Sequence, residues 1–118
     1  MRFWAALENQ DFDRAAEEID EEFEETYPQS GEHIVGRDKF VGLLKAFPGF
    51  PRVKVRRHRG TGDFWVTEAA FDYARDASTP WEVCEVQELR DGKIRRITAF
   101  FGAPFDPAEW RVPFVQPG

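Results

Sequence analysis

The sequence predicts an α+β fold, in which N-terminal helices cover one face of a curved antiparallel sheet that forms a cone around an internal pocket. Apolar residues recur at helical spacing in the first half of the chain, up to Pro48. Strand-like alternation then dominates residues 52–101, where Asp91-Gly92 separates two alternating runs. Helices followed by a meander of long strands can bury their apolar stripes together against one face of the sheet.

Two helices are expected at the N-terminus. Apolar residues recur at helical spacing in the first seven positions, and Asp11 is placed to cap a second helix after a short break. Of residues 8–32 only Arg14 is basic, while acidic residues cluster between Glu17 and Glu25. We interpret this charge run as the solvated face of a helix.

Two short strands and a third helix complete this half. The strands are expected over residues 23–27, where Pro28 ends the first, and over residues 32–35. Gly36 then opens the helix, and Pro48-Gly49 ends it. Its buried stripe follows the i, i+3, i+4, i+7 pattern and consists of Phe40, Leu43, Leu44 and Phe47.

Two longer strands are expected over residues 52–59 and 64–73. The first places Val53 and Val55 on one face and Lys54, Arg56 and His58 on the other. This basic face can bind an anion, but we favour a solvated face near the acidic N-terminal half. The second strand has no cleanly polar face, which is typical of a sheet covered on both sides, by helices and by a second subunit. We therefore expect a homodimer.

The Asp91-Gly92 dipeptide predicts the register of the last two strands, because Asp-Gly fills the two φ > 0 positions of a type I′ hairpin turn. The expected pairs are Arg90 with Lys93, Leu89 with Ile94, Glu88 with Arg95, Gln87 with Arg96, Glu85 with Thr98, Cys84 with Ala99 and Val83 with Phe100. One face of the hairpin then carries a polar cluster between apolar ends, which we interpret as the floor of a site. The cluster consists of Glu85, Gln87, Arg96 and Thr98. A covered Arg96 in that cluster needs a carboxylate or a ligand.

Composition limits the classes of partner. A chain of 118 residues is long enough for one core, so we expect a single domain over residues 1–118. The net charge of −6 argues against nucleic acid or an anionic membrane as a partner. The one cysteine, Cys84, cannot form an internal disulfide and fits a reducing compartment. No apolar run is long enough for a signal peptide or a membrane span, and we expect a cytoplasmic protein.

Metal and nucleophile chemistry have little support in the sequence. His33 and His58 are the only histidines, and they fall on different expected elements without metal-ligand spacing. Cys84 falls on the apolar packing face of the predicted hairpin, so we interpret it as a small core residue. The chain has no Gly-rich phosphate loop. We therefore expect neither a metal nor an organic cofactor.

Several motifs between Phe3 and Val115 point to one family: Asp11-Phe12-Asp13, Tyr27-Pro28-Gln29-Ser30-Gly31-Glu32, Gly36-Arg37, Glu68, Tyr73, Asp91-Gly92-Lys93-Ile94, Phe101-Gly102-Ala103-Pro104-Phe105 and Trp110-Arg111. With them the chain resembles the SnoaL-like, polyketide-cyclase-like branch of the nuclear-transport-factor-2-like superfamily, whose fold is also called cystatin-like. The resemblance implies a carboxylate acid/base in an apolar cone, often in a homodimer without cofactors. Its members include isomerases, aldol cyclases, dehydratases, epoxide hydrolases and non-catalytic modules, so the fold does not settle the function.

The candidate acid/base residues are Glu85 and Glu68, which strand alternation can aim inward. Burial among rings raises the pKa of a glutamate toward neutrality, but direct pairing with Arg96 would keep Glu85 ionised. One hypothesis is a lyase or isomerase acting on a small apolar carbonyl compound, with Arg96 polarising the developing oxyanion. The other is a non-catalytic homodimeric ligand-binding module. The expected pocket residues are Tyr27, Trp65, Val83, Gln87, Thr98 and Phe100, the last at a position where the family commonly has tyrosine.

Near the C-terminus, Asp106-Pro107-Ala108-Glu109 has the pattern of a helix start, with a capping Asp, proline at the first helical position and Glu three residues after the cap. Trp110 is expected to anchor this turn on the body of the protein.

Overall fold

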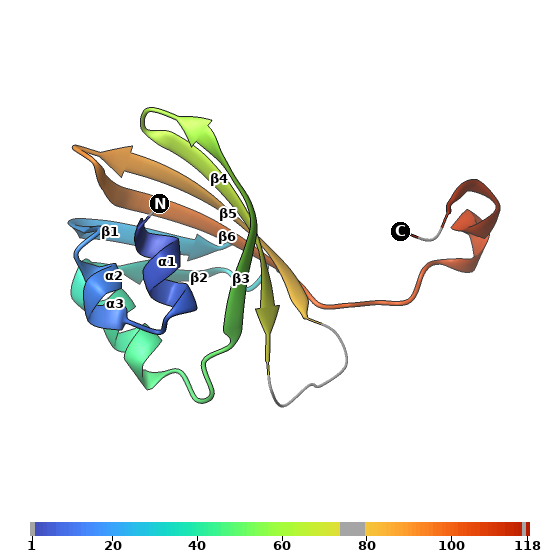
Figure 1. Ribbon diagram of the computed structural model, residues 1–118, viewed down its shortest axis with the longest axis horizontal. Coiled ribbons are helices and arrows are strands. Elements are labelled where there is room, and N and C mark those ends of the chain that lie inside the picture. Colours follow the sequence, from blue (N-terminus) through green and yellow to red (C-terminus); the bar gives the residue numbers. More distant parts are fainter. Residues whose placement is uncertain (1, 74–79, 117) are drawn as a thin grey trace.

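The computed structural model describes residues 2–73, 80–116 and 118, and in this part of the chain three α-helices lie against one face of a six-stranded sheet (Figure 1). The helices are α1 (Arg2–Glu8), α2 (Phe12–Ala16) and α3 (Arg37–Ala46). The strands are β1 (Ile19–Tyr27), β2 (Glu32–Val35), β3 (Arg52–Thr61), β4 (Phe64–Asp72), β5 (Trp81–Arg90) and β6 (Lys93–Gly102), and a 3-10 helix, η1 (Glu109–Phe114), follows them.

The strand order is β2-β1-β6-β5-β4-β3. Every neighbouring pair is antiparallel except β1 and β6, which run parallel. The sheet curves around the helices, and its concave inner face packs with them into the core (Figure 1). The predicted α+β fold with a curved sheet around N-terminal helices is therefore confirmed.

Local signals place the starts of α2 and α3 where the sequence predicts them. The Asp11 side chain caps α2 by accepting a 3.1 Å hydrogen bond from the Arg14 backbone N–H. Gly36 precedes α3 with a φ of 97°, a conformation that favours glycine, and its N–H donates to the Phe23 carbonyl at 2.6 Å. This bond ties the start of α3 to the centre of β1.

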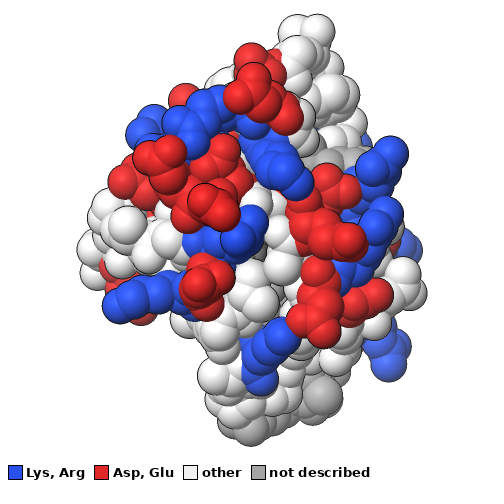
Figure 2. Space-filling view, turned by 90° about the vertical axis from the view of Figure 1, so that its left-hand side faces the viewer, with Lys and Arg blue, Asp and Glu red and all other residues white. Residues whose placement is uncertain are grey.

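The acidic run is not a helix face, which corrects the prediction. Most of it belongs to β1, which begins at Ile19, four residues earlier than expected. Ile19 and Phe23 are fully buried, so the burial of these apolar side chains favours a strand in the sheet over a solvated helix. Acidic and basic side chains are interleaved over this end of the molecule (Figure 2), where Arg90 contacts both Asp20 and Glu22 at 2.9 Å.

The predicted hairpin turn is confirmed, but the register beyond it is wrong. Asp91 and Gly92 have φ values of 52° and 79°, as a type I′ turn requires. Leu89 pairs with Ile94 as expected, and the register then shifts, so that Glu88 pairs with Arg96 and Glu85 with Ala99. The extra residue, Arg95, forms a β-bulge.

The bulge has a packing cause. Ile94 and Ile97 are 2% and 0% exposed, yet strict alternation places residues three apart on opposite faces of a strand. One inserted residue lets both side chains enter the core. It also moves every side chain beyond it to the face opposite the predicted one. Arg96, Thr98 and Phe100, predicted to face inward, therefore lie on the outer face.

A second bulge corrects the prediction for the basic strand. The β3–β4 register shifts between Val55 and Arg57. His58 consequently pairs with Thr67 on the inner side instead of sharing a face with Lys54 and Arg56. The same shift moves Arg57 and Arg59, which alternation would place on the face of Val53 and Val55, to the outer face, where both contact Glu68.

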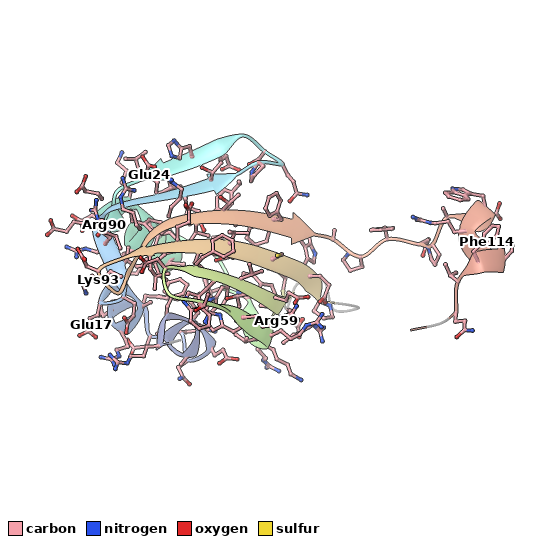
Figure 3. The ribbon with its side chains drawn as sticks, turned by 90° about the horizontal axis from the view of Figure 1, so that it is seen from above. Glu17, Glu24, Arg59, Arg90, Lys93 and Phe114 are labelled. Atoms are coloured by element: carbon pink, nitrogen blue, oxygen red, sulfur yellow. The ribbon has the colours of Figure 1, made fainter. Side chains whose placement is uncertain are left out.

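The chain leaves the body after Gly102 and carries η1 at some distance from the sheet (Figures 1 and 3). The predicted helix start is wrong, because the residue before η1 is Ala108, with no side-chain cap. Trp110 does not anchor the turn, since it is 74% exposed. Within the described residues, the helices are all too short or too polar to cross a bilayer.

Candidate active site

Two glutamates converge on one cavity at the inner face of the sheet. Glu25, on β1, is 2% exposed, and Glu85, on β5, is 5% exposed. One strand, β6, lies between them: Glu25 pairs with Ile97, and Ala99 pairs with Glu85. Both carboxyl side chains line the same cavity of about 60 Å³.

The cavity is closed by apolar side chains from the helices, from the segment before β3 and from β4. Most of them are rings or large aliphatic groups, contributed by Phe3, Leu7, Phe40, Leu44, Phe50 and Phe71. Such walls exclude water and strengthen any electrostatic interaction inside the cavity. The space next to the carboxyl groups is therefore narrow and mostly apolar.

The narrow cavity opens into a wider mouth of about 520 Å³. The residues that line both spaces are Tyr27, Leu43, Phe47, Tyr73 and Phe101. Leu43 and Phe47 are 39% and 36% exposed, so only Phe40 and Leu44 of the predicted buried stripe are in the core. The outer half of that stripe forms one wall of the mouth.

Tyr27 links the mouth to the inner carboxyl groups. Its hydroxyl donates a 2.5 Å hydrogen bond to Oε1 of Glu25. Its ring packs edge-on against Phe101, with 5.7 Å between the centroids. Burial, followed by the charge of Glu25, raises the pKa of Tyr27, so this hydroxyl keeps its proton at neutral pH and remains a donor.

Burial shifts both carboxyl groups toward the protonated form. It raises the pKa of Glu25 to about 7, although the Tyr27 hydrogen bond opposes this shift. It also raises the pKa of Glu85 well above its ordinary value, and the charge of Glu25 adds to the effect. Among the described residues that line the cavity, none is Lys or Arg. The pKa of Glu25 thus lies near neutral pH, and burial favours the protonated form of Glu85.

Glu68, the other candidate acid/base, does not reach the cavity. It lies on the outer face, where its carboxylate accepts hydrogen bonds of 2.9 Å from Arg57 and 3.1 Å from Arg59. The bond from Arg57 is the main reason that its pKa is lowered. An ionised, exposed carboxylate with two guanidinium partners lacks the environment expected of the acid/base group.

Arg96 is also on the outer face, so its predicted place beside Glu85 is wrong. Its guanidinium lies 3.4 Å from Glu24 and 3.7 Å from Glu88, and its side chain is 47% exposed. The polar cluster predicted for the floor of the site is thus divided between the two sides of the sheet. Because Arg96 lies outside the cavity, Glu85 is free of the ion pair that would keep its carboxyl group ionised.

Thr98, Phe100 and Cys84 share the outer face with Arg96. Phe100 is 41% exposed, so position 100 does not face the cavity. The tyrosines that line the cavity are Tyr27 and Tyr73. Cys84 is half-buried on this face instead of lying in the core as predicted. Burial raises the pKa of its thiol.

Gln87 is fully buried and belongs to a polar network beside the cavity. With its amide oxygen turned toward α1, it accepts hydrogen bonds of 3.1 Å from the Trp4 indole N–H and 3.0 Å from the Thr67 hydroxyl. His58 Nδ1 lies 2.6 Å from that hydroxyl, and the His58 ring stacks on Trp65 at 4.7 Å. Two predicted pocket residues, Gln87 and Trp65, therefore support the wall without lining the cavity.

The remaining predicted pocket residues divide in the same way. Val83 is on the inner face and buried in the core, while Tyr27 lines both the cavity and the mouth. In the part of the chain that the structure describes, no three His, Cys, Asp or Glu side chains are grouped to hold a metal ion.

Glu25 is the functional candidate that the sequence analysis missed. A signal was present, because alternation along the expected strand places Phe23, Glu25 and Tyr27 on one face. Tyr27 was already expected in the pocket, so Glu25 belonged beside it. Its position within an acidic run hid this, since such runs are usually solvated.

The fold and the cavity define a class of protein. A crystal structure of an NTF-2-like protein of unknown function from Burkholderia xenovorans is 35% identical, with a TM-score of 0.85 over 98% of this chain and 89% of that one. A candidate ketosteroid isomerase from Kribbella flavida is 20% identical, with a TM-score of 0.89 over 99% and 84%. An LEH-like epoxide hydrolase of M. tuberculosis is 26% identical, with a TM-score of 0.69 over 85% and 77%. The protein thus has an NTF2-like, cystatin-like fold.

The family is narrower than the fold. The model of the SnoaL-like domain matches residues 1–97, most of the chain. The chain therefore belongs to the SnoaL-like domain family, as the sequence motifs indicate. No curated protein matches it.

Proposed function

We propose that this protein is a cofactor-independent acid/base enzyme, a lyase or isomerase that acts on a small apolar carbonyl compound. The observation that carries the proposal is the pair Glu25 and Glu85: two buried carboxyl groups in one apolar cavity, with no guanidinium or ammonium group among its described lining residues. Pairs of carboxyl groups whose environments raise their pKa values are typical of sites that move protons.

The two carboxyl groups suit different parts of one reaction. Glu25, with a pKa raised to about 7, is ionised often enough to remove a proton from the carbon next to a carbonyl group. Glu85, whose burial favours the protonated form, donates a hydrogen bond to the carbonyl oxygen as negative charge develops on it. The proton on Glu25 then returns to another carbon in an isomerisation, or to a leaving group in an elimination.

Tyr27 positions the base in this scheme. Its hydroxyl holds Oε1 of Glu25 at 2.5 Å, which leaves the other carboxylate oxygen to face the cavity. The same hydrogen bond favours the ionised form and so counteracts part of the effect of burial.

The shape of the site supports a substrate with a carbonyl group at one end. The inner cavity of about 60 Å³ accepts only the reacting end of a molecule. The mouth of about 520 Å³, with Phe47, Tyr73, Trp81 and Phe101 in its walls, suits an apolar remainder. The names of two similar structures, an LEH-like epoxide hydrolase and a candidate ketosteroid isomerase, support an enzyme without specifying this substrate.

The second candidate function is a non-catalytic, homodimeric ligand-binding module. The small volume beside the carboxyl groups, about 60 Å³, favours it, because a ligand held only in the mouth would not reach Glu25 or Glu85. In that case the two carboxyl groups take part in no reaction.

Exchange of carbon-bound protons separates the two functions. A thermal-shift screen against small apolar carbonyl compounds identifies a ligand, because binding to the folded state alone raises stability. Proton exchange next to its carbonyl group is then followed by NMR in D₂O. Glu25→Gln and Glu85→Gln should each retain ligand binding and slow exchange by about 10²- to 10⁴-fold.

Glu88→Gln is the matched control, since Glu88 lies on the same strand as Glu85 but faces solvent, and it should leave the exchange rate unchanged. If Glu25→Gln and Glu85→Gln both exchange protons at the wild-type rate, the acid/base proposal fails and the binding module stands.

A further inference from the structure

Aromatic rings form most of the wall of the mouth. They belong to Tyr27, Phe47, Tyr73, Trp81 and Phe101. On one side, the Tyr73 ring stacks on Phe47 with 6.3 Å between the centroids and meets Trp81 edge-on at 5.5 Å. The Tyr27–Phe101 pair stands apart from this group. Four of the five side chains are half-buried and Phe47 is 36% exposed, so a ligand in the mouth can reach all of them.

Rings give this wall an electrostatic character that aliphatic side chains lack. The face of an aromatic ring is electron-rich, so it attracts a cation that lies within about 6 Å of the centroid, and tryptophan attracts it most strongly. Among the described residues of the mouth, Leu43 is the one aliphatic side chain. A ligand in the mouth therefore meets ring surface on most sides, which suits a cation with apolar substituents.

A carboxylate adds negative charge to the same wall. Glu32 lines the mouth, and its Oε1 accepts a 2.6 Å hydrogen bond from the Ser30 hydroxyl. Burial is the largest cause of the raised pKa of Tyr27, but the charge of Glu32 contributes to it, so the field of this carboxylate reaches the inner end of the mouth. Within the described part of the chain, no Lys, Arg or His lines the mouth to offset it.

The other polar groups of the mouth already have partners in the protein. Gln29 Oε1 accepts a 2.7 Å hydrogen bond from the Phe101 N–H, and the Ser30 hydroxyl donates to Glu32. A primary ammonium group brings three N–H donors that each need an acceptor. A tertiary or quaternary ammonium group has one N–H or none, and its alkyl groups pack against rings. The mouth therefore suits the alkylated groups better.

Size and net charge agree with this choice. The mouth of about 520 Å³ has room for a trimethylammonium group and for the rest of a small ligand, whereas the inner cavity of about 60 Å³ does not. The whole chain has a net charge of −6, which raises the local concentration of cations around it.

We propose that the mouth binds the alkylated ammonium group of an organic cation, which the rings hold by cation–π contacts and Glu32 attracts by its charge. This inference names the class of ligand for the mouth, and it rests on the proposal that the ligand enters the site there. It requires no chemistry at Glu25 or Glu85. If those residues are catalytic, the part of the substrate remote from the carbonyl group carries the ammonium group.

Titration calorimetry with two probes of equal shape tests the inference. The probes are choline and the neutral alcohol that has carbon in place of the choline nitrogen, both titrated at constant chloride concentration. Choline should bind about 10-fold more tightly than the alcohol, because only choline makes cation–π contacts. A purely apolar mouth gives the opposite order, since a cation loses more hydration on binding than a neutral molecule does.

Two substitutions locate the bound cation. Trp81→Leu keeps an apolar wall but removes the ring, so it should abolish most of the preference for choline. Its matched control is Trp110→Leu, since Trp110 is 74% exposed and lies outside the mouth. Circular dichroism checks that both variants are folded.

Glu32→Gln tests the contribution of charge. It should weaken choline binding by about 2- to 5-fold, the usual range for an exposed charge pair, and leave binding of the neutral alcohol unchanged. Glu32 is exposed, so this variant should fold as wild type does. Glu109→Gln is the matched control, because Glu109 is also exposed but lies outside the mouth.

Three results would overturn the inference: no binding of choline, binding of the alcohol at least as tight, or a choline preference that survives both Trp81→Leu and Glu32→Gln. None of them bears on proton exchange by Glu25 and Glu85, which is measured separately on a neutral carbonyl compound. Conversely, unchanged exchange in Glu25→Gln and Glu85→Gln would defeat the proposed enzyme and leave a cation site in the mouth intact.

Discussion

Glu68 and Glu85 show how the face of a sheet determines the chemistry of one residue type. On neighbouring strands, Glu68 pairs with Cys84 and Glu85 pairs with Thr67, so the two glutamates are one position apart. Glu85 enters the core, where burial raises its pKa. Glu68 faces solvent, where the hydrogen bond from Arg57 lowers its pKa. A difference of one position along the strands thus separates a buried carboxyl group from a surface ion pair.

At this scale we predict that Glu25→Gln lowers the pKa of Glu85. The substitution removes the negative charge of Glu25, which helps to raise the pKa of Glu85, while burial keeps that pKa above its ordinary value. NMR titration of the labelled glutamate carboxyl carbons measures the shift. Glu68→Gln is the control and should leave the titration of Glu85 unchanged, and an equal midpoint for Glu85 in both variants would show that Glu25 and Glu85 do not interact.

At the scale of the element, two β-bulges decide what faces inward. The bulge at Arg95 moves Arg96 out of the site, and the shift between Val55 and Arg57 brings His58 in.

The far end of the β3–β4 hairpin is tightly packed: a Cβ on Gly60 would lie 2.1 Å from the Phe64 carbonyl oxygen and 2.6 Å from Trp65 Cα. Both contacts are with backbone, which cannot move aside as a flexible side chain can.

Gly60→Ala should therefore lower the free energy of unfolding by about 1–3 kcal/mol, the usual cost of forcing extra volume into a packed site. The matched control is Gly42→Ala in α3, where an added Cβ meets nothing within 4 Å. Alanine is the better helix former, so this change should raise stability by about 0.5–1 kcal/mol. Urea unfolding followed by tryptophan fluorescence measures both variants, and equal effects would contradict the packing argument.

At the scale of the whole molecule, the buried carboxyl pair affects the pH dependence of stability. The folded state raises the pKa of Glu25 from 4.5 to about 7, so it binds a proton that the unfolded chain has lost. This contribution is fully present below pH 4.5 and is lost as the pH rises through about 7. Asp20 and Glu68, whose pKa values are lowered, act oppositely and contribute stability that is lost in acid.

We predict that the free energy of unfolding falls as the pH rises from about 5 to 8, and that Glu25→Gln flattens this fall by up to about 3 kcal/mol, because one pKa unit corresponds to about 1.4 kcal/mol. Urea unfolding at a series of pH values measures the slope. Glu88→Gln should reproduce the wild-type slope, and a Glu25→Gln slope equal to that of wild type would mean that Glu25 is not protonated by folding.

The sequence by itself determined the fold class, the starts of α2 and α3, and the last hairpin turn. Asp11 and Asp91-Gly92 act through local geometry, since a cap and a tight turn require only their nearest neighbours. The inner position of Glu85 also followed from alternation, because no bulge interrupts β5 between Glu85 and the core residues beside it. Motifs spread over the whole chain were enough to indicate the SnoaL-like family.

Only the tertiary structure decided which other residues accompany Glu85. Strict alternation would place Ile94 and Ile97 on opposite faces of their strand. The bulge buries both side chains, because both pack in the same core. The pairing of Glu25 with Glu85 depends on β1 lying parallel to β6, a contact between segments about seventy residues apart. Alternation is a local rule, and it fails where packing with a distant segment inserts a residue.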